Sequence, residues 1–167
     1  IFVTGPFGYT SVGLDILLNN KNQKNNFVKK AIKSVTNPKP NLSYGLKNKK
    51  YFSSSMDSSD GLSTTLNEMS KQSKKKFIIN NIPSNKDLEK YIKKQKGDLN
   101  SIIFHGGEEY EFIFTIPAKY KKNIMKNSKL SKTPIIEIGY VVSGKGVYLK
   151  ENNRNILLKD LGWKHFK

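Results

Sequence analysis

The most informative absences in this sequence concern cysteine, histidine and long apolar runs. There is no cysteine, which excludes disulfides and thiolate metal sites and is compatible with the cytoplasmic location that we expect. Only His105 and His165 are present, too few for a zinc site built mainly on histidine. No stretch approaches the roughly 18 apolar residues that a membrane-spanning helix needs, so no membrane span is predicted.

Acidic residues are few, and the formal net charge is +17. Such an excess of positive charge could attract nucleic acid, an anionic membrane surface or phosphorylated small molecules. However, Arg154 is the sole arginine, although arginine is the usual residue for bidentate contacts to phosphate and guanine. The lysines are also spread along the chain. The pattern therefore favours a solvated, lysine-rich surface, with a nucleic-acid-binding domain as the alternative.

The 167 residues fit one domain, in which strand-like and helix-like segments are mixed without strict alternation. We therefore expect an α+β fold (α/β layered), with a mixed, mostly antiparallel sheet and helices packed on it. The chain begins inside a strand-like run, IFVTG, which indicates part of a longer protein. Strands are predicted at residues 1–5, 51–56, 76–80, 134–142, 146–150, 155–159 and on both sides of a glycine pair in 101–117. Helices are predicted at residues 10–19, 23–35, 42–49, 60–72, 85–96 and 117–127.

The stretch DSSDG, residues 57–61, places Asp57 and Asp60 just before an apolar helical face. One interpretation is a helix start, with Ser59 or Asp60 as the N-cap, which explains one acidic residue but does not require two. The other interpretation is a Mg²⁺ site that uses both carboxylates, beside a helix N-terminus that attracts phosphate. The residues alone leave both open. The helical face consists of Leu62, Leu66 and Met69.

The stretch HGGEEYE, residues 105–111, joins a glycine pair to three glutamates in four residues. Adjacent glycines let the backbone turn sharply and approach a ligand closely. One interpretation is a turn between strands with exposed acids. The other is an acid at the turn that faces a cationic or polar substrate. His105 by itself is interpreted as structural.

Two further stretches contain glycine and aromatic residues. GWKHF, residues 162–166, holds Trp163, the only tryptophan, which could seal the core or stack on a flat or cationic ring. GPFGYTSVGL, residues 5–14, has glycines that match neither G-x-G-x-x-G nor a P-loop. As a phosphate-binding loop it is a weak signal.

The order and spacing of four stretches resemble those of the thiamine-monophosphate kinases. The stretches are VTGPFGYTSVGL, SMDSSDGL, GGEEYEFIFT and GWKHF. That family shows VTG with a GL pair, then D-x-S-D-G-L, GGEDYEL and an end like GWDHF. The wider superfamily includes aminoimidazole-ribotide synthetase, selenophosphate synthetase and a hydrogenase-maturation protein. The resemblance implies that residues 1–167 are a single C-terminal-type domain with the aminoimidazole-ribotide synthetase-like fold. The N-terminal domain, which in the family supplies further aspartate ligands and the main dimer interface, is absent from this chain.

The resemblance also implies transfer of the γ-phosphoryl of ATP to thiamine monophosphate, with Mg²⁺, to give thiamine diphosphate and ADP. Carried onto this chain, Asp57 and Asp60 would ligate Mg²⁺ and Ser59 would contact ATP. No residue is assigned as a general base. The residues implied to meet the substrate are Glu108, Trp163 and, as a weaker candidate, Glu111.

Three positions depart from the family pattern: Glu109 stands where Asp is usual, Ser58 where an aliphatic residue is usual, and Lys164 where Asp is usual. They leave the reaction class intact but affect the expected substrate geometry. We expect a homodimer at full length and no activity from the isolated chain. The alternatives are another ATP-dependent enzyme of the superfamily, a degenerate structural domain, or the basic nucleic-acid-binding domain.

Overall fold

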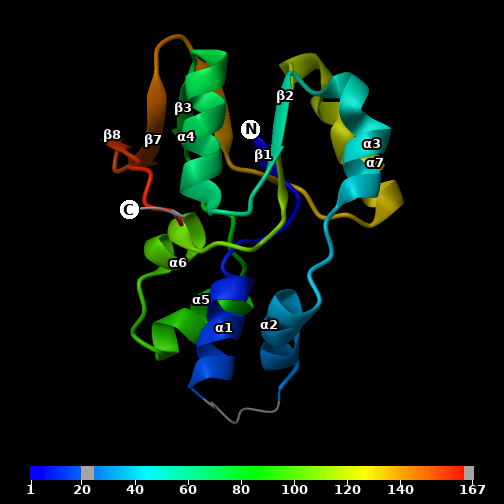
Figure 1. The fold of residues 1–167 in the computed structure, drawn as a ribbon. Coiled ribbons are helices and arrows are strands. Elements are labelled where there is room, and N and C mark those ends of the chain that lie inside the picture. The colour runs from blue at the N-terminus through cyan, green and yellow to red at the C-terminus, as the bar shows by residue number, and fades with distance from the viewer. Residues whose placement is uncertain (20–24, 164–167) are drawn as a thin grey trace.

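The computed structural model describes residues 1–19 and 25–163, and its elements confirm the α+β class. The strands are divided between two four-stranded sheets rather than gathered in one (Figure 1). The first sheet, in the order β2-β4-β1-β5, is antiparallel throughout. Its strands are β1 (Phe2–Val3), β2 (Ser54–Asp57), β4 (Phe112–Thr115) and β5 (Ile136–Glu137).

The second sheet has the order β6-β3-β7-β8, and only its β3 and β7 pair is parallel. The strand predicted at 134–142 is therefore two strands in different sheets. The break falls at Ile138, which is fully buried and whose carbonyl accepts hydrogen bonds from the amides of Asn80 and Asn81. The strands of this sheet are β3 (Lys76–Ile79), β6 (Gly139–Val142), β7 (Gly146–Glu151) and β8 (Arg154–Leu157).

The helices are arranged in groups around the sheets (Figure 1). In that view α1, α2 and α5 lie together below the sheets, while α3 and α7 lie side by side next to the first sheet. Helix α4 contacts β2 as well as β3 and β7, so it bridges the two sheets. The helices are α1 (Tyr9–Leu18), α2 (Asn26–Thr36), α3 (Leu42–Asn48), α4 (Leu62–Ser73), α5 (Lys86–Lys94), α6 (Leu99–His105) and α7 (Lys121–Ser131).

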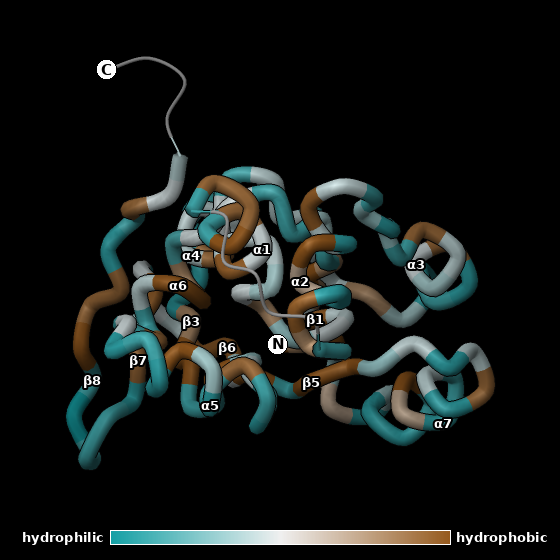
Figure 2. Tube along the Cα trace, turned by 90° about the horizontal axis from the view of Figure 1, so that it is seen from below, coloured by the Kyte–Doolittle hydropathy of each residue, from teal (hydrophilic) through white to brown (hydrophobic). Residues whose placement is uncertain are grey.

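The core follows the predicted apolar faces. Leu62, Leu66 and Met69 on α4 are all buried, as their helical spacing predicts. In Figure 2 the apolar stretches of β3, β5 and β6 run through the middle of the molecule, and the tip between β7 and β8 is hydrophilic. A separate cluster between the first sheet and α3 and α7 contains Phe2, Tyr44, Phe114 and Ile124.

None of the helices within the described ranges is long and apolar enough to cross a membrane.

The expectation of a strand on both sides of the glycine pair is wrong on the N-terminal side. Residues 99–105 form the helix α6, and only the C-terminal side forms a strand, β4. The carboxylate of Asp98 accepts a hydrogen bond from the Asn100 amide at 3.0 Å and so caps α6. The apolar run that follows buries Ile103 and Phe104. The periodicity of an apolar run this short does not distinguish a helix from a strand. The cap at Asp98 is therefore the feature that favours the helix.

Gly13 sets how closely α1 and α2 approach each other. A Cβ atom at this position would lie 2.0 Å from the carbonyl oxygen of Ala31 on α2. The backbone of α1 at Gly13 therefore packs directly against the backbone of α2 at Ala31, with no side chain of α1 between them. Their spacing also determines the spacing of Leu14 and Val35, which line the same cavity.

We predict that Gly13→Ala lowers the free energy of unfolding by about 2 kcal/mol, because the added methyl group forces the helices apart. Gly45→Ala on α3 is the matched control. Its Cβ would have its nearest neighbour, Phe112, at 3.5 Å, so the usual helical preference for alanine should raise stability by about 0.5–1 kcal/mol. Urea unfolding measures both changes. A stabilising effect at both glycines would contradict the close helix contact.

Candidate functional site

Backbone hydrogen bonds join two of the sequence motifs directly. We call residues 57–60 the aspartate segment and residues 106–111 the glutamate loop. The Ser58 amide donates to the Glu111 carbonyl at 3.0 Å, and the Ser58 carbonyl accepts from the Tyr110 amide at 2.9 Å. The Ser59 carbonyl accepts from the Glu108 amide at 2.6 Å. The loop therefore continues the pairing of β2 with β4 beyond the end of both strands.

The C-terminal tryptophan motif joins the same segment. The Trp163 amide donates to the Asp60 carbonyl at 2.9 Å. Gly162 lies so close that a Cβ atom there would be 2.1 Å from the same carbonyl oxygen. Three motifs that are about 50 residues apart in the sequence thus meet at the aspartate segment. Lys164, His165 and Phe166, the remainder of the GWKHF stretch, lie outside the described residues.

The N-cap interpretation of the aspartate segment is wrong. Helix α4 begins after Gly61, which adopts φ 111° and makes no side-chain cap bond. Neither Ser59 nor Asp60 is the N-cap. Within the described residues, no hydrogen bond or ion pair engages the carboxylate of Asp57 or Asp60. Both carboxylates are therefore available for another partner.

Asp57 and Asp60 line a small cavity of about 180 Å³. Glu68 on α4 lines it as well, which the sequence reading did not anticipate. Among the described residues, no group of three or more possible ligands is close enough to enclose a metal ion. Two carboxylates still suit a hard cation such as Mg²⁺, which is usually held by one or two carboxylates together with water and substrate phosphates. We call this space the small cavity.

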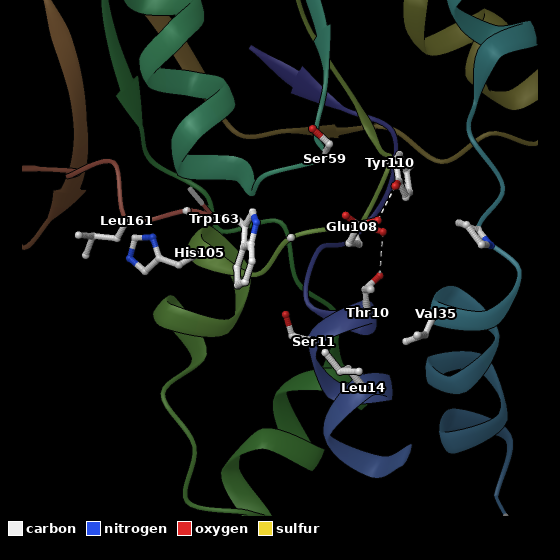
Figure 3. Close-up of a pocket in the computed structure, with 13 residues that line it drawn as sticks. Thr10, Ser11, Leu14, Val35, Ser59, His105, Glu108, Tyr110, Leu161 and Trp163 are labelled. Carbon is white, nitrogen blue, oxygen red and sulfur yellow. Dashed lines mark hydrogen bonds between the residues drawn. The ribbon is translucent and has the colours of Figure 1, made fainter. Parts of the chain in front are cut away.

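A second cavity, of about 590 Å³, shares the lining residue Ser59 with the small cavity. We call it the large cavity (Figure 3). The indole of Trp163 projects into it and is 67% exposed, so the interpretation that this residue seals the core is wrong. The side chains that line the large cavity include Thr10, Ser11, Leu14, Val35, His105, Glu108, Tyr110 and Trp163.

The glutamate loop reaches the large cavity in a strained conformation. Glu108 and Tyr110 adopt φ values of 63° and 51°, in the left-handed region that non-glycine residues rarely occupy. The Tyr110 hydroxyl donates a hydrogen bond to the Glu108 carboxylate, and this bond raises the pKa of Tyr110. Such strain is commonly held at ligand-binding positions. The loop therefore has a conformation maintained by its surroundings, with an acid at its turn.

Several lining residues were not predicted from the sequence. His105, interpreted as structural, lines the large cavity, and its Nδ1 lies 2.9 Å from the Ser63 hydroxyl. Burial lowers the pKa of His105, so its ring is neutral at neutral pH. Leu14 and Val35, which line the cavity from α1 and α2, were not singled out in the sequence. Leu14 is 46% exposed in the described chain, and no local sequence signal distinguishes it from the buried leucines.

The other two glutamates of the loop point away from the large cavity. The carboxyl group of Glu111 accepts hydrogen bonds from the Thr4 hydroxyl at 2.6 Å and from the side-chain amide of Asn41 at 2.8 Å. Glu109 is held by backbone amides at the start of α1. Both line a third cavity, of about 310 Å³, and burial raises the pKa of each to about 7. The N-terminus of α1 is thereby occupied by a carboxylate from the chain itself, which agrees with the weak phosphate-loop signal of residues 5–14.

Ser58, one of the three positions that depart from the family pattern, lies in an environment that does not suit its hydroxyl group. Its side chain is fully buried, and its hydroxyl has no hydrogen-bond partner within the described residues. A buried hydroxyl without a partner costs free energy, about 1–3 kcal/mol in protein variants. An aliphatic residue, usual here in the resembled family, would avoid that cost.

We predict that the fold loses stability as pH rises from about 4.5 to 7, because of Glu109 and Glu111. Their folded pKa of about 7 exceeds the ordinary 4.5, so the folded chain retains protons that the unfolded chain has released. Each group should lower the free energy of unfolding by about 2–3 kcal/mol over this range, and the pair by about 5 kcal/mol. The double variant Glu109→Gln, Glu111→Gln keeps the acceptors but does not titrate. Urea unfolding at several pH values should show a smaller decline in that variant; equal declines would refute the assignment.

Curated proteins similar to this chain share one name. No family model matches the chain. A thiamine-monophosphate kinase of Nitrosopumilus maritimus is 65% identical over 167 residues, which are 100% of this chain and 53% of that protein. A thiamine-monophosphate kinase of Pyrococcus horikoshii is 34% identical over 140 residues, 83% of this chain and 42% of that protein. The chain spans about half the length of the curated relatives it matches.

Solved structures agree with the sequence comparison. One described as AaThiL complexed with AMPPCP and TMP matches with a TM-score of 0.82 and 29% identity, over 99% of this chain and 50% of that one. HypE of E. coli, at 18% identity and a TM-score of 0.70 over 99% of this chain and 50% of that one, shares the fold alone. The aminoimidazole-ribotide synthetase-like fold is thereby confirmed. Over its full length, this chain is therefore homologous to about half of the thiamine-monophosphate kinases that it matches.

Proposed function

We propose that this chain supplies one part of a site that transfers the γ-phosphoryl of ATP to thiamine monophosphate. The products are thiamine diphosphate and ADP. The observation that carries the proposal is the aspartate segment, which separates a cavity with two available carboxylates from a cavity with an acid and an exposed indole. The relatives named as thiamine-monophosphate kinases support this reaction over another of the same superfamily.

The large cavity has the chemistry to hold the thiamine part of the substrate. Thiamine carries a cationic thiazolium ring, which is attracted to the face of an indole and to a carboxylate. Trp163 and Glu108 provide these two groups, and Leu14 and Val35 add apolar surface for the flat rings. We assign substrate binding to Trp163 and Glu108. Glu111 lines a different cavity, so the proposal does not place it against the substrate.

The small cavity has the chemistry to hold the metal and the polyphosphate. Asp57 and Asp60 are the residues that would ligate Mg²⁺, which when bound neutralises phosphate charge. Ser59 lines both cavities, so we place it beside the phosphates that meet there. The acceptor is an oxygen of the substrate phosphate. It bonds to the γ-phosphorus while the bond from that phosphorus to the bridging oxygen of ADP breaks. Catalysis of this kind rests on positioning and charge neutralisation, and we assign no general base.

The chain would need the remainder of a longer protein for this reaction. Asp57 and Asp60 fill only part of the coordination shell of Mg²⁺. Among the described residues, no group of three or more possible side-chain ligands, Glu68 included, is arranged to hold the ion, so a further protein ligand would come from outside this chain. We propose that the other half of the protein supplies it, that the full-length protein is a cytoplasmic homodimer, and that the isolated chain is inactive. A nucleic-acid-binding role is less well supported, because the lysines are spread along the chain and Arg154 is the sole arginine.

We predict that Asp57→Asn in the full-length protein lowers kcat for thiamine monophosphate at least about 100-fold, since even outer-shell changes at metal sites cost 10–100-fold. Stability should change by less than about 0.5 kcal/mol, because Asp57 is exposed and its carboxylate makes no bond in the described chain. Asp87→Asn, at an exposed position on α5, is the control and should leave kcat unchanged. ADP release and urea unfolding measure the two effects. Loss of stability in proportion to activity would count against a metal-binding role.

A further inference from the structure

Glu109 closes the N-terminal end of α1 from outside the helix. Its Oε1 accepts hydrogen bonds from the Gly8 amide at 2.6 Å and the Thr10 amide at 3.0 Å. Gly8 is the N-cap residue and makes no side-chain cap bond, and the first turn of α1 contains no acidic residue. The unpaired amides of a helix start need an acceptor, and a carboxylate there also interacts favourably with the helix dipole. Glu109 therefore does the work of an N-cap from a position 101 residues away.

A third bond ties the same two segments together. The Thr10 hydroxyl donates to the Glu108 carbonyl at 3.4 Å. On its other side, the Glu108 amide donates to the Ser59 carbonyl. Glu108 is therefore held between α1 and the aspartate segment. Its left-handed backbone is costly for a glutamate and persists only where neighbouring contacts maintain it.

The directions of the loop side chains separate two roles. Glu108 and Tyr110 line the large cavity, whereas Glu109, between them, does not. Thr10, at the start of α1, lines the large cavity from the other side (Figure 3). A change at Glu109 would therefore alter the spacing of two cavity walls without removing any group that contacts a ligand in that cavity.

We infer that Glu109 is a positioning residue: by capping α1 it fixes the α1 wall of the large cavity relative to Glu108, and so sets the affinity for the cationic part of thiamine monophosphate. The affinity part rests on the proposed function. The positioning part rests only on the contacts of Glu109 and applies to any ligand of this cavity.

The test compares three variants of the full-length protein. Glu109→Ala removes the acceptor, whereas Glu109→Gln keeps an oxygen that can accept both amide bonds. Asn25→Ala is the matched control, because Asn25 caps α2 by accepting from the Val28 amide at 2.9 Å and does not line the large cavity. Both alanine variants lose the acceptor of one helix cap. The unfolding free energy, the Kd for thiamine monophosphate by calorimetry, and backbone hydrogen exchange are measured for each.

We expect Glu109→Ala to weaken binding at least about 10-fold and to speed exchange at the Glu108 and Tyr110 amides. Glu109→Gln should stay within about threefold of the parent in affinity, and Asn25→Ala should change neither affinity nor exchange in the loop. Glu109→Ala that binds as tightly and exchanges as slowly as the parent would overturn the inference and leave Glu109 as a structural cap only.

Two further outcomes keep the experiment decisive. If the parent protein does not bind thiamine monophosphate, the proposed function fails, and exchange at the Glu108 amide alone decides the positioning role. If Glu109→Ala does not fold, Thr10→Val replaces it, since this change keeps the Thr10 backbone amide but removes the hydroxyl that bonds to the Glu108 carbonyl and interacts with the Glu109 carboxyl group. Faster exchange at Glu108 in that variant supports the inference, and unchanged exchange refutes it.

Discussion

The hydrogen bonds between the aspartate segment and the glutamate loop are the contacts on which the candidate site depends. They extend the antiparallel pairing of β2 with β4 and so bring together residues about 50 positions apart. Glycine makes the approach possible, because a Cβ atom at Gly107 would lie 2.9 Å from the Ser59 carbonyl oxygen. The same segment accepts a hydrogen bond from the Trp163 amide, so one short stretch of backbone positions a pair of acids, a third acid and an indole.

This arrangement gives the aspartate segment two faces with different chemistry. Asp57 and Asp60 line the small cavity, and Glu108 and Trp163 line the large one, while Ser59 lines both. A phosphoryl transfer needs the metal-bound polyphosphate and the organic acceptor to meet at one point, with each held from its own side. The proposed function uses the two cavities as this meeting point. The family relationship and the local geometry therefore support the same account by independent routes.

The sequence predicted the helices and strands better than it predicted the tertiary contacts between them. The buried face of α4 follows from helical spacing alone, and the four motifs led to the resemblance that the comparisons confirm. The strand prediction before the glycine pair failed because a short apolar run has no distinguishing period. The N-cap interpretation is wrong because Gly61, not Ser59 or Asp60, is the residue that precedes the first residue of α4, Leu62. The exposure of Trp163 depends on a distant backbone contact. Cavity walls from α1 and α2 also depend on tertiary packing, which no local pattern encodes.

The most direct test of the account is a crystal structure of the full-length protein with thiamine monophosphate, Mg²⁺ and a non-hydrolysable ATP analogue. The account predicts that the thiazolium ring lies in the large cavity against Trp163 and Glu108, with Mg²⁺ ligated by Asp57 and Asp60 across the aspartate segment. Thiamine monophosphate bound outside the large cavity, or Mg²⁺ ligated by neither aspartate, would contradict it.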